Sequence, residues 1–307
     1  GEPLPPAPAR RLEALPAPRR IGAGWRVLDG DALKPEPVSA ADAGRGSDTE
    51  PVPARAALAR DDILRFPDGP AAEDAIRLAL ARADFADPAS WEDAAWEALR
   101  AHPQPGTWGS GQGEARERAQ AAMLQRMLQD VLSTEIAPGL RLRHLERGRW
   151  LSGLEFTLPV SGLTSGELEA LRLPALAADA PDAAGYLRGV IDLVFEHEGR
   201  WWLLDWSGAQ PGLRARDYGA EALARDAAAR GYEQQALLHT LALQRWLRRR
   251  VPGWRADTHF GGALRVYVRG ARPGWRNEDG SACGAHRFQV MQEALKSGKA
   301  PWDGAQP

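Results

Sequence analysis

One stretch, "YLRGVIDLVFEHEGRWWLLDW" at residues 186–206, constrains the fold more than any other part of this sequence. Two apolar runs of strand-like composition flank Glu198-Gly199, which suits the two-residue loop of a β-hairpin. With that loop, the register of the hairpin places Asp192 directly opposite Asp205. The Cβ atoms of the two residues would lie about 4.5–5.5 Å apart on one face of the hairpin.

A pair of opposed carboxylates needs a compensating charge, because like charges across a strand pair are destabilising. Mg²⁺ is a natural occupant, since it prefers hard oxygen ligands and is often held by one or two carboxylates. The alternative is that both acids cap an exposed hairpin. Each acid interrupts a strongly apolar run, where a solvated acid is not expected, and this favours a site. Ser207 follows on the same face, one step beyond Asp205.

The spacing of apolar residues in the rest of the chain predicts an α/β protein. Apolar residues recur at helical spacing in residues 71–85, 90–102 and 114–133, and a long amphipathic helix begins at Tyr232. Strand-like runs occupy residues 154–160 and 259–270. The expected organisation is a Pro/Ala-rich linker or arm (1–60), a helical section (61–150), an α/β core (151–290) and a C-terminal helix or tail (291–307).

Composition limits the functional classes without choosing among them. The chain has 307 residues and a net charge of −2, so a surface for nucleic acid would have to be local. No apolar run approaches the roughly 20 residues that span a bilayer, and the single cysteine, Cys283, fits a reducing cytoplasm. The chain begins at Gly1 without a methionine, as a piece of a longer protein would. No lysine occurs between residues 35 and 295.

Residues 186–206, taken with "YEQQALLHTLALQRWLRRRVPGWRADTHFGGALRVYVRG" at 232–270, resemble the C-terminal nuclease domain of RecB-type subunits of bacterial exodeoxyribonuclease V. That domain belongs to the PD-(D/E)xK superfamily, and the similarity runs from about residue 61 to residue 270. The resemblance implies a restriction-endonuclease-like core and Mg²⁺-dependent DNA cleavage. It also implies DNA, RecC-like and RecD-like subunits and a RecA-like recombinase as partners.

Carried over residue by residue, the resemblance keeps four positions of the family site. Asp192 and Asp205 match its two metal-binding acids, and Glu155 matches an acid on the preceding strand. Gln235 matches the glutamine of a Q-x-x-x-Y helix motif. These four residues are the catalytic candidates, and the two aspartates are the metal ligands if any metal is bound.

Four other positions depart from the family pattern. Ser207 stands in the slot of the D-x-K lysine, and Arg77 stands where the family has a metal-binding histidine. Ala81 replaces a glutamate on the same predicted helix, and His239 replaces the tyrosine of Q-x-x-x-Y. A guanidinium has no lone pair with which to bind a metal. The departures therefore predict weak or absent nuclease activity.

Arg77 suggests a specific replacement for the metal. A guanidinium reaching Asp192 and Asp205 would neutralise both acids through bidentate hydrogen bonds. The alternative is that Arg77 points to solvent from an amphipathic helix.

Residues 245–276 are rich in arginine: this stretch contains nine arginines and a single acid, Asp257. This excess could follow a DNA backbone, with neighbouring tryptophans as stacking faces, or it could be a solvated helix end. The candidate DNA-binding residues are Arg248, Arg249, Arg250 and Arg269.

Three functions fit these observations. The first is a degenerate RecB-like nuclease domain, kept in a helicase–nuclease as a structural, DNA-guiding or partner-docking module in double-strand-break repair. The second is an active Mg²⁺-dependent deoxyribonuclease. The third is an unrelated DNA-binding domain that shares only the hairpin.

Overall fold

The structure, a computed structural model, describes residues 26–29, 58–104, 111–163, 167, 171 and 185–288. Its helices and strands follow one another as β1 (Arg26–Asp29), η3 (Ile63–Arg65), α1 (Pro70–Arg82), α2 (Ser90–Ala101), α3 (Gly111–Ser133), β2 (Glu135–Ala137), β3 (Leu140–Arg141), η4 (Leu142–His144), β4 (Trp150–Pro159), η5 (Val160–Gly162), β5 (Gly185–His197), β6 (Arg200–Ser207), η6 (Ala215–Tyr218), α6 (Ala220–Ala229), α7 (Tyr232–Arg248), α8 (Ala256–His259), β7 (Phe260–Tyr267) and β8 (Ala285–Arg287).

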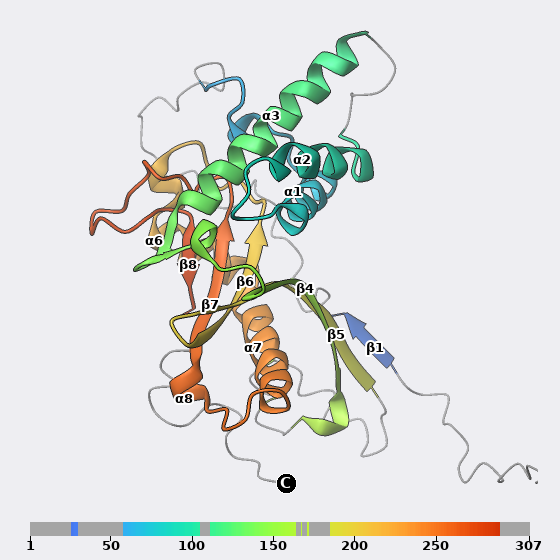
Figure 1. Cartoon of the computed structure of the whole chain (residues 1–307), viewed down its shortest axis with the longest axis vertical. Helices are drawn as coiled ribbons and strands as arrows, with labels where there is room; N and C mark the ends of the chain where they lie inside the picture. Colours follow the sequence, from blue (N-terminus) through green and yellow to red (C-terminus); the bar gives the residue numbers. More distant parts are fainter. Residues whose placement is uncertain are drawn as a thin grey trace, which may run out of the picture.

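A mixed six-stranded sheet organises the described chain (Figure 1). Its order is β1-β5-β6-β7-β8, and β4 pairs with β5 outside this path. The β4–β5, β5–β6 and β7–β8 pairs are antiparallel, whereas β6–β7 and β1–β5 are parallel. A mixed sheet with helices on both sides confirms the predicted α/β class.

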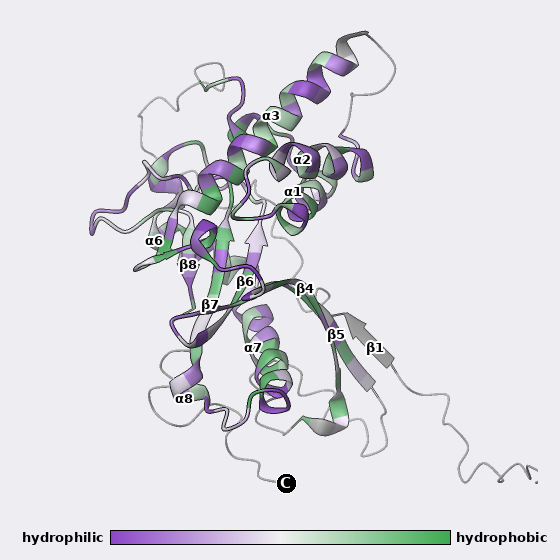
Figure 2. Cartoon of the chain, in the orientation of Figure 1, coloured by the Kyte–Doolittle hydropathy of each residue, from purple (hydrophilic) through white to green (hydrophobic). Residues whose placement is uncertain are grey.

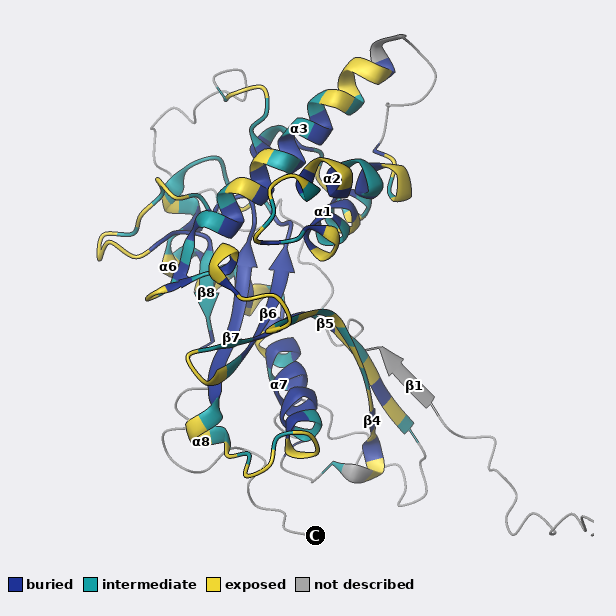
Figure 3. Ribbon diagram, in the orientation of Figure 1, coloured by how far each residue is buried: buried dark blue, intermediate teal, exposed yellow. Residues whose placement is uncertain are grey.

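Two hydrophobic clusters hold helices against the sheet. One joins α1, α2 and α3 to the central strands and includes Ile76, Leu124 and Leu204. The other cluster packs α6 and α7 against the opposite face of the sheet and includes Leu203, Leu223 and Leu238. β6 and β7 are buried between these layers (Figure 3). Hydrophobic and hydrophilic bands alternate along α1 to α3 and α7, as helices with one buried face require (Figure 2).

The β4–β5 ribbon changes its packing partner at Gly153, opposite Asp192. Ile191 packs in the α7 cluster, but Leu193, two residues later on the same strand, packs in the α1–α3 cluster. The register of the two strands continues through this point, and Gly153 has a φ of +67°. Only glycine adopts that conformation without strain. The local twist at Gly153 therefore sets the direction of Asp192.

The glycines of "HFGG" have a packing role. A Cβ on Gly261 would lie 2.2 Å from the Cε2 atom of Trp202, which is closer than any real contact. Gly262 has a φ of +145°. The sequence therefore needs glycine here for the indole of Trp202 to pack against the start of β7.

The hairpin prediction is confirmed in its loop and in its register. Glu198 and Gly199 form the loop with φ values of +51° and +73°, and His197 pairs with Arg200. Two expectations change. β4 begins four residues before the predicted strand, and β1 lies inside the segment expected to be an arm. The predicted tail at 291–307 and most of the arm lie outside the described residues, so the proposed domain boundaries stay predictions.

Candidate functional site

The two aspartates meet where β5 and β6 stop pairing through their backbones. The last backbone pair is Leu193–Leu204, and the next position places Asp192 opposite Asp205. At this position the carboxylate of each aspartate, instead of a backbone carbonyl, accepts a hydrogen bond from a backbone N–H of the other strand. Asp192 N donates to Asp205 Oδ1 (3.3 Å), and Trp206 N donates to Asp192 Oδ2 (2.9 Å). Asp205 is only 2% exposed, so the alternative of two solvated hairpin caps is wrong.

Asp205 is surrounded by positive or proton-donating groups. His239 Nδ1 lies 2.8 Å from Asp205 Oδ2, and Arg265 Nη2 lies 3.8 Å from the same oxygen. Burial alone would raise the pKa of Asp205. His239 and Arg265 overcome that effect and lower the pKa to about 2. Asp205 is therefore ionised at neutral pH, and groups inside the protein compensate its charge.

Arg265 was not predicted as a site residue, and it is fully buried on β7. Its Nη2 donates to Gln235 Oε1 (2.5 Å) and its Nη1 donates to the carbonyl of Trp206 (3.4 Å). Its guanidinium also stacks 3.8 Å from the centre of the Tyr232 ring. The one signal in the sequence was an arginine inside the otherwise apolar strand "FGGALRVY".

Arg77 reaches only one of the two acids. Its Nε lies 3.9 Å from Asp192 Oδ2, which is an ion pair rather than a hydrogen bond. Burial and the charge of Asp205 raise the pKa of Asp192, and Arg77 offsets only part of this effect. The predicted bidentate clamp across both acids is wrong in this form, because Asp205 receives its cation from Arg265 instead.

The other predicted site residues divide between an open groove and the buried interior. Glu155, Gln235, Arg77 and Asp192 line a groove of about 810 Å³. Glu155 is exposed, whereas Gln235 is bound to Arg265.

Of the four substituted positions, Arg77 is the one that lines the groove, whereas Ser207, Ala81 and His239 do not line it. Ser207 is 2% exposed, and its Oγ accepts a bond from Ala209 N (3.3 Å). Ala81 lies with Gly153 and Asp192 at a smaller cavity of about 240 Å³. His239 uses its Nδ1 on Asp205 from within the core.

These residues do not fit a Mg²⁺ ion. Both oxygens of Asp205 already accept bonds from groups inside the protein, and two of its neighbours can carry positive charge. A divalent cation beside Arg77 and Arg265 would be repelled by both. Throughout the described part of the chain, no group of three or more His, Cys, Asp or Glu residues is arranged to hold a metal.

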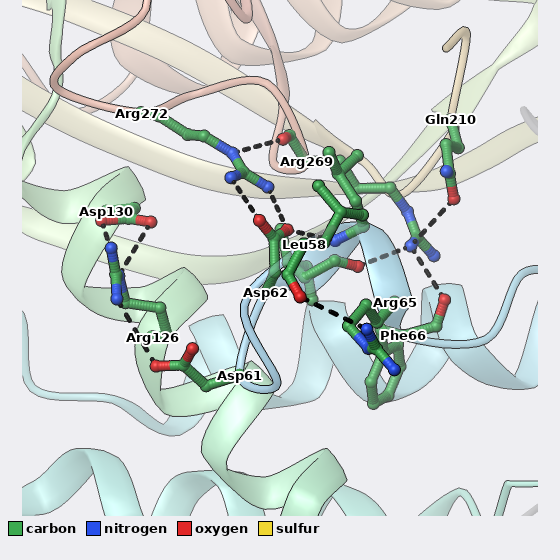
Figure 4. Close-up of polar contacts among 12 residues, drawn as sticks. Leu58, Asp61, Asp62, Arg65, Phe66, Arg126, Asp130, Gln210, Arg269 and Arg272 are labelled. Atoms are coloured by element: carbon green, nitrogen blue, oxygen red, sulfur yellow. Dashed lines mark hydrogen bonds and ion pairs between the residues drawn. The ribbon is translucent and has the colours of Figure 1, made fainter. Parts of the chain in front are cut away.

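The structure corrects the expectation for Arg269, which is fully buried. Figure 4 shows its guanidinium beside Phe66 and the segment before α1. Its guanidinium donates to the carbonyls of Gly208, Ile63, Phe66 and Pro67. These bonds join the exit of β6 to the segment before α1. Arg269 Nη1 also donates to Gln210 Oε1 (3.3 Å). Because Arg269 is fully buried and bonded to groups inside the protein, it cannot reach a DNA phosphate in this structure.

The arginine track is also shorter than the sequence suggests. Arg245 pairs with Glu167, Arg255 with Asp257, and Arg272 with Asp62. The candidates Arg248, Arg249 and Arg250 are exposed at the end of α7. At about 1.5 Å per residue, Arg248 lies roughly 20 Å along the helix from Gln235. A DNA contact there would be separate from the acid pair.

No helix in the described residues is both long and apolar enough to cross a membrane.

The mixed sheet and the acid pair at its diverging central strands define the class of this protein. They are those of a restriction-endonuclease-like α/β core, the fold that the sequence predicts. No family model matches the chain.

Comparison with curated proteins identifies the relationship more closely. The chain is 36% identical over 140 residues to "RecBCD enzyme subunit RecB" of Escherichia coli, which covers 43% of this chain and 12% of that protein. It is 29% identical over 317 aligned positions to the subunit of the same name from Mycolicibacterium smegmatis, which covers 87% of this chain and 28% of that protein. The Haemophilus influenzae subunit is 37% identical over 98 residues, which covers 32% of this chain and 8% of that protein.

These matches show a relationship to RecB subunits that extends well beyond the hairpin, so the third hypothesis, an unrelated domain that shares only the hairpin, is wrong. The chain spans only 12% and 28% of the length of the E. coli and M. smegmatis subunits.

Proposed function

We propose that this chain is a degenerate nuclease domain of a RecB-like helicase–nuclease that acts in the repair and recombination of DNA double-strand breaks. It serves there as a structural, DNA-guiding or partner-docking module rather than as the cleaving centre. Its partners are DNA and RecC-like and RecD-like subunits, with a RecA-like recombinase receiving the processed strand in the cytoplasm. The similarity to RecB subunits supports this assignment.

The carrying observation is the internal neutralisation of the acid pair. Arg77 pairs with Asp192, while Arg265 and His239 surround Asp205. A metal nuclease needs these carboxylates to hold cations that activate water and stabilise the leaving group. Here the protein itself supplies two guanidinium groups and a histidine hydrogen bond, and both Arg265 and His239 are buried.

Digestion of linear DNA with Mg²⁺ or Mn²⁺ tests the proposal. We expect no cleavage by the wild-type chain and no stoichiometric metal binding in calorimetry. Metal-dependent cleavage that disappears in Asp205→Ala would refute degeneracy. The double variant Ser207→Lys with Arg77→His is the informative companion, because any activity that it gains would come from the scaffold around the unchanged acids.

An active Mg²⁺-dependent deoxyribonuclease is the second candidate, and one observation favours it. Asp192 and Glu155 both line the open groove beside Arg77. If Arg77 moves away when DNA binds, these two acids could hold one metal. The same digestion assay separates the candidates, with Glu155→Gln as a matched variant that should matter only to an active enzyme.

A further inference from the structure

β4 is an edge strand with an unusual composition. It pairs with β5 on one side, and no described residue pairs with the backbone on its other side. Its ten residues, "WLSGLEFTLP", contain a single charge, Glu155. Proteins usually protect such edges with charges, prolines or short length. This edge has one charge, and its only proline is its last residue.

Exposed apolar side chains gather on the same ribbon. Among the described residues, the large hydrophobic side chains that are exposed are Leu151 on β4 and Tyr186 and Val190 on β5, at 45%, 41% and 48%. Along the limb of the ribbon beside β1, exposed and less exposed residues alternate (Figure 3). Leu151 and Pro159, the partner of Tyr186, are eight residues apart on β4, so these side chains lie along the ribbon rather than in one patch. Exposed apolar groups along a strand pair with an unpaired edge favour the addition of another strand there.

The unpaired backbone groups of a strand edge determine which kind of ligand can bind there. Outward-facing N–H donors and C=O acceptors alternate along the strand, and equivalent groups repeat at about 6.6–6.8 Å. An extended polypeptide matches this pattern with its own alternating donors and acceptors. A nucleic-acid backbone offers phosphate acceptors but no donors for the carbonyls. The ribbon already accepts such a strand on its other edge, where β1 pairs with β5 over four residues.

We propose that the free edge of β4, from Leu151 to Leu158, binds an extended segment of a partner polypeptide by strand addition. The segment carries apolar side chains beside Leu151 and a basic side chain opposite Glu155, because opposite charges are favourable across a strand pair. That the partner is a RecC-like subunit rests on the proposed function.

Hydrogen exchange of the chain alone and in complex with the purified RecC-like subunit tests the proposal. In the free chain, the amides of β4 that bond β5 are protected and the alternate, outward amides exchange fast. In the complex, the outward amides become protected. Leu151→Lys places a gatekeeper charge on an already exposed residue, so it should fold normally and weaken binding at least tenfold. Ala224→Lys, which adds the same charge at an exposed residue of α6, is the matched control and should bind as wild type.

Each outcome decides between the two proposals. A complex whose outward β4 amides stay fast, and which tolerates Leu151→Lys, overturns strand addition but leaves the RecB-like assembly intact. If no complex forms, the assembly in the proposed function fails, and strand addition by its RecC-like subunit fails with it.

Discussion

Asparagine at position 205 should destabilise the fold, whereas asparagine at position 192 should stabilise it. The two changes are isosteric and remove one charge each from neighbouring residues. Their opposite effects follow from the opposite pKa shifts of the two acids. The pKa of Asp205 is lowered to about 2, and the pKa of Asp192 is raised.

The size of the Asp205 effect comes from the linkage between pKa and stability. The shift from 3.8 to about 2, at about 1.36 kcal/mol per unit, corresponds to roughly 2 kcal/mol of stability in the ionised state. Because the folded pKa is depressed, this stability is fully present above about pH 4. It is lost as the pH falls from there toward 2. Asp205→Asn should therefore cost about 2 kcal/mol at pH 7 and much less near pH 2.

Asp192 behaves in the opposite sense. Burial disfavours its charged form, and the ion pair with Arg77 at 3.9 Å does not restore the balance. Ionisation of Asp192 therefore lowers the stability of the fold as the pH rises above the unfolded pKa. Asparagine removes that charge, and its Oδ1 can still accept the bond from Trp206 N. Asp192→Asn should raise the free energy of unfolding at pH 7.

Urea denaturation of the wild type and both variants measures these changes, at pH 7 and in steps down to about pH 2. A parallel series with millimolar Mg²⁺ provides the contrast, because a metal site would require both carboxylates. Equal losses from the two variants would refute the internal compensation described here. So would a Mg²⁺-dependent gain in wild-type stability that disappears in both variants.

Three other expectations follow from the structure. Arg269→Met should cost at least about 3 kcal/mol in urea denaturation, because it strips a buried guanidinium from four backbone carbonyls. Gly153→Ala should cost about 1 kcal/mol or more by the same measurement, since φ is +67° there. Arg248→Glu with Arg249→Glu and Arg250→Glu should weaken any binding to DNA ends and flatten its salt dependence in gel shifts, while cleavage and stability are unchanged.

The hairpin was predictable because its determinants are local. A two-residue loop fixes the register of both strands, and the register alone places Asp192 opposite Asp205. The long helix at α7 was predictable for a similar reason, since the apolar residues from Tyr232 onward recur at helical spacing.

The partners of the acids were not predictable from local patterns. Arg265 comes to Asp205 through the parallel pairing of β6 with β7, which are separated along the chain by η6, α6, α7 and α8. Only the three-dimensional register shows that these two residues lie side by side. Arg269 was misassigned for the same reason. Arg269 lies four residues after Arg265 and donates to backbone carbonyls of the segment before α1. No local pattern in the sequence indicates that these carbonyls need a side-chain donor.

The charges at the site explain why its departures from the family pattern belong together. The resemblance implies that Ser207 stands in the slot of the family's lysine, so position 207 supplies no cation, and buried acids without partners are costly. Arg77 offsets part of the burial cost of Asp192 from α1, and His239 donates to Asp205 from α7. Arg265 then lies close enough to both Gln235 and Asp205 to fix the arrangement. Each of these groups occupies a position where added positive charge would be repelled. Changing Ser207 and Arg77 alone therefore leaves Asp205 bound by His239 and Arg265, and a working metal site would require those two contacts to be released as well.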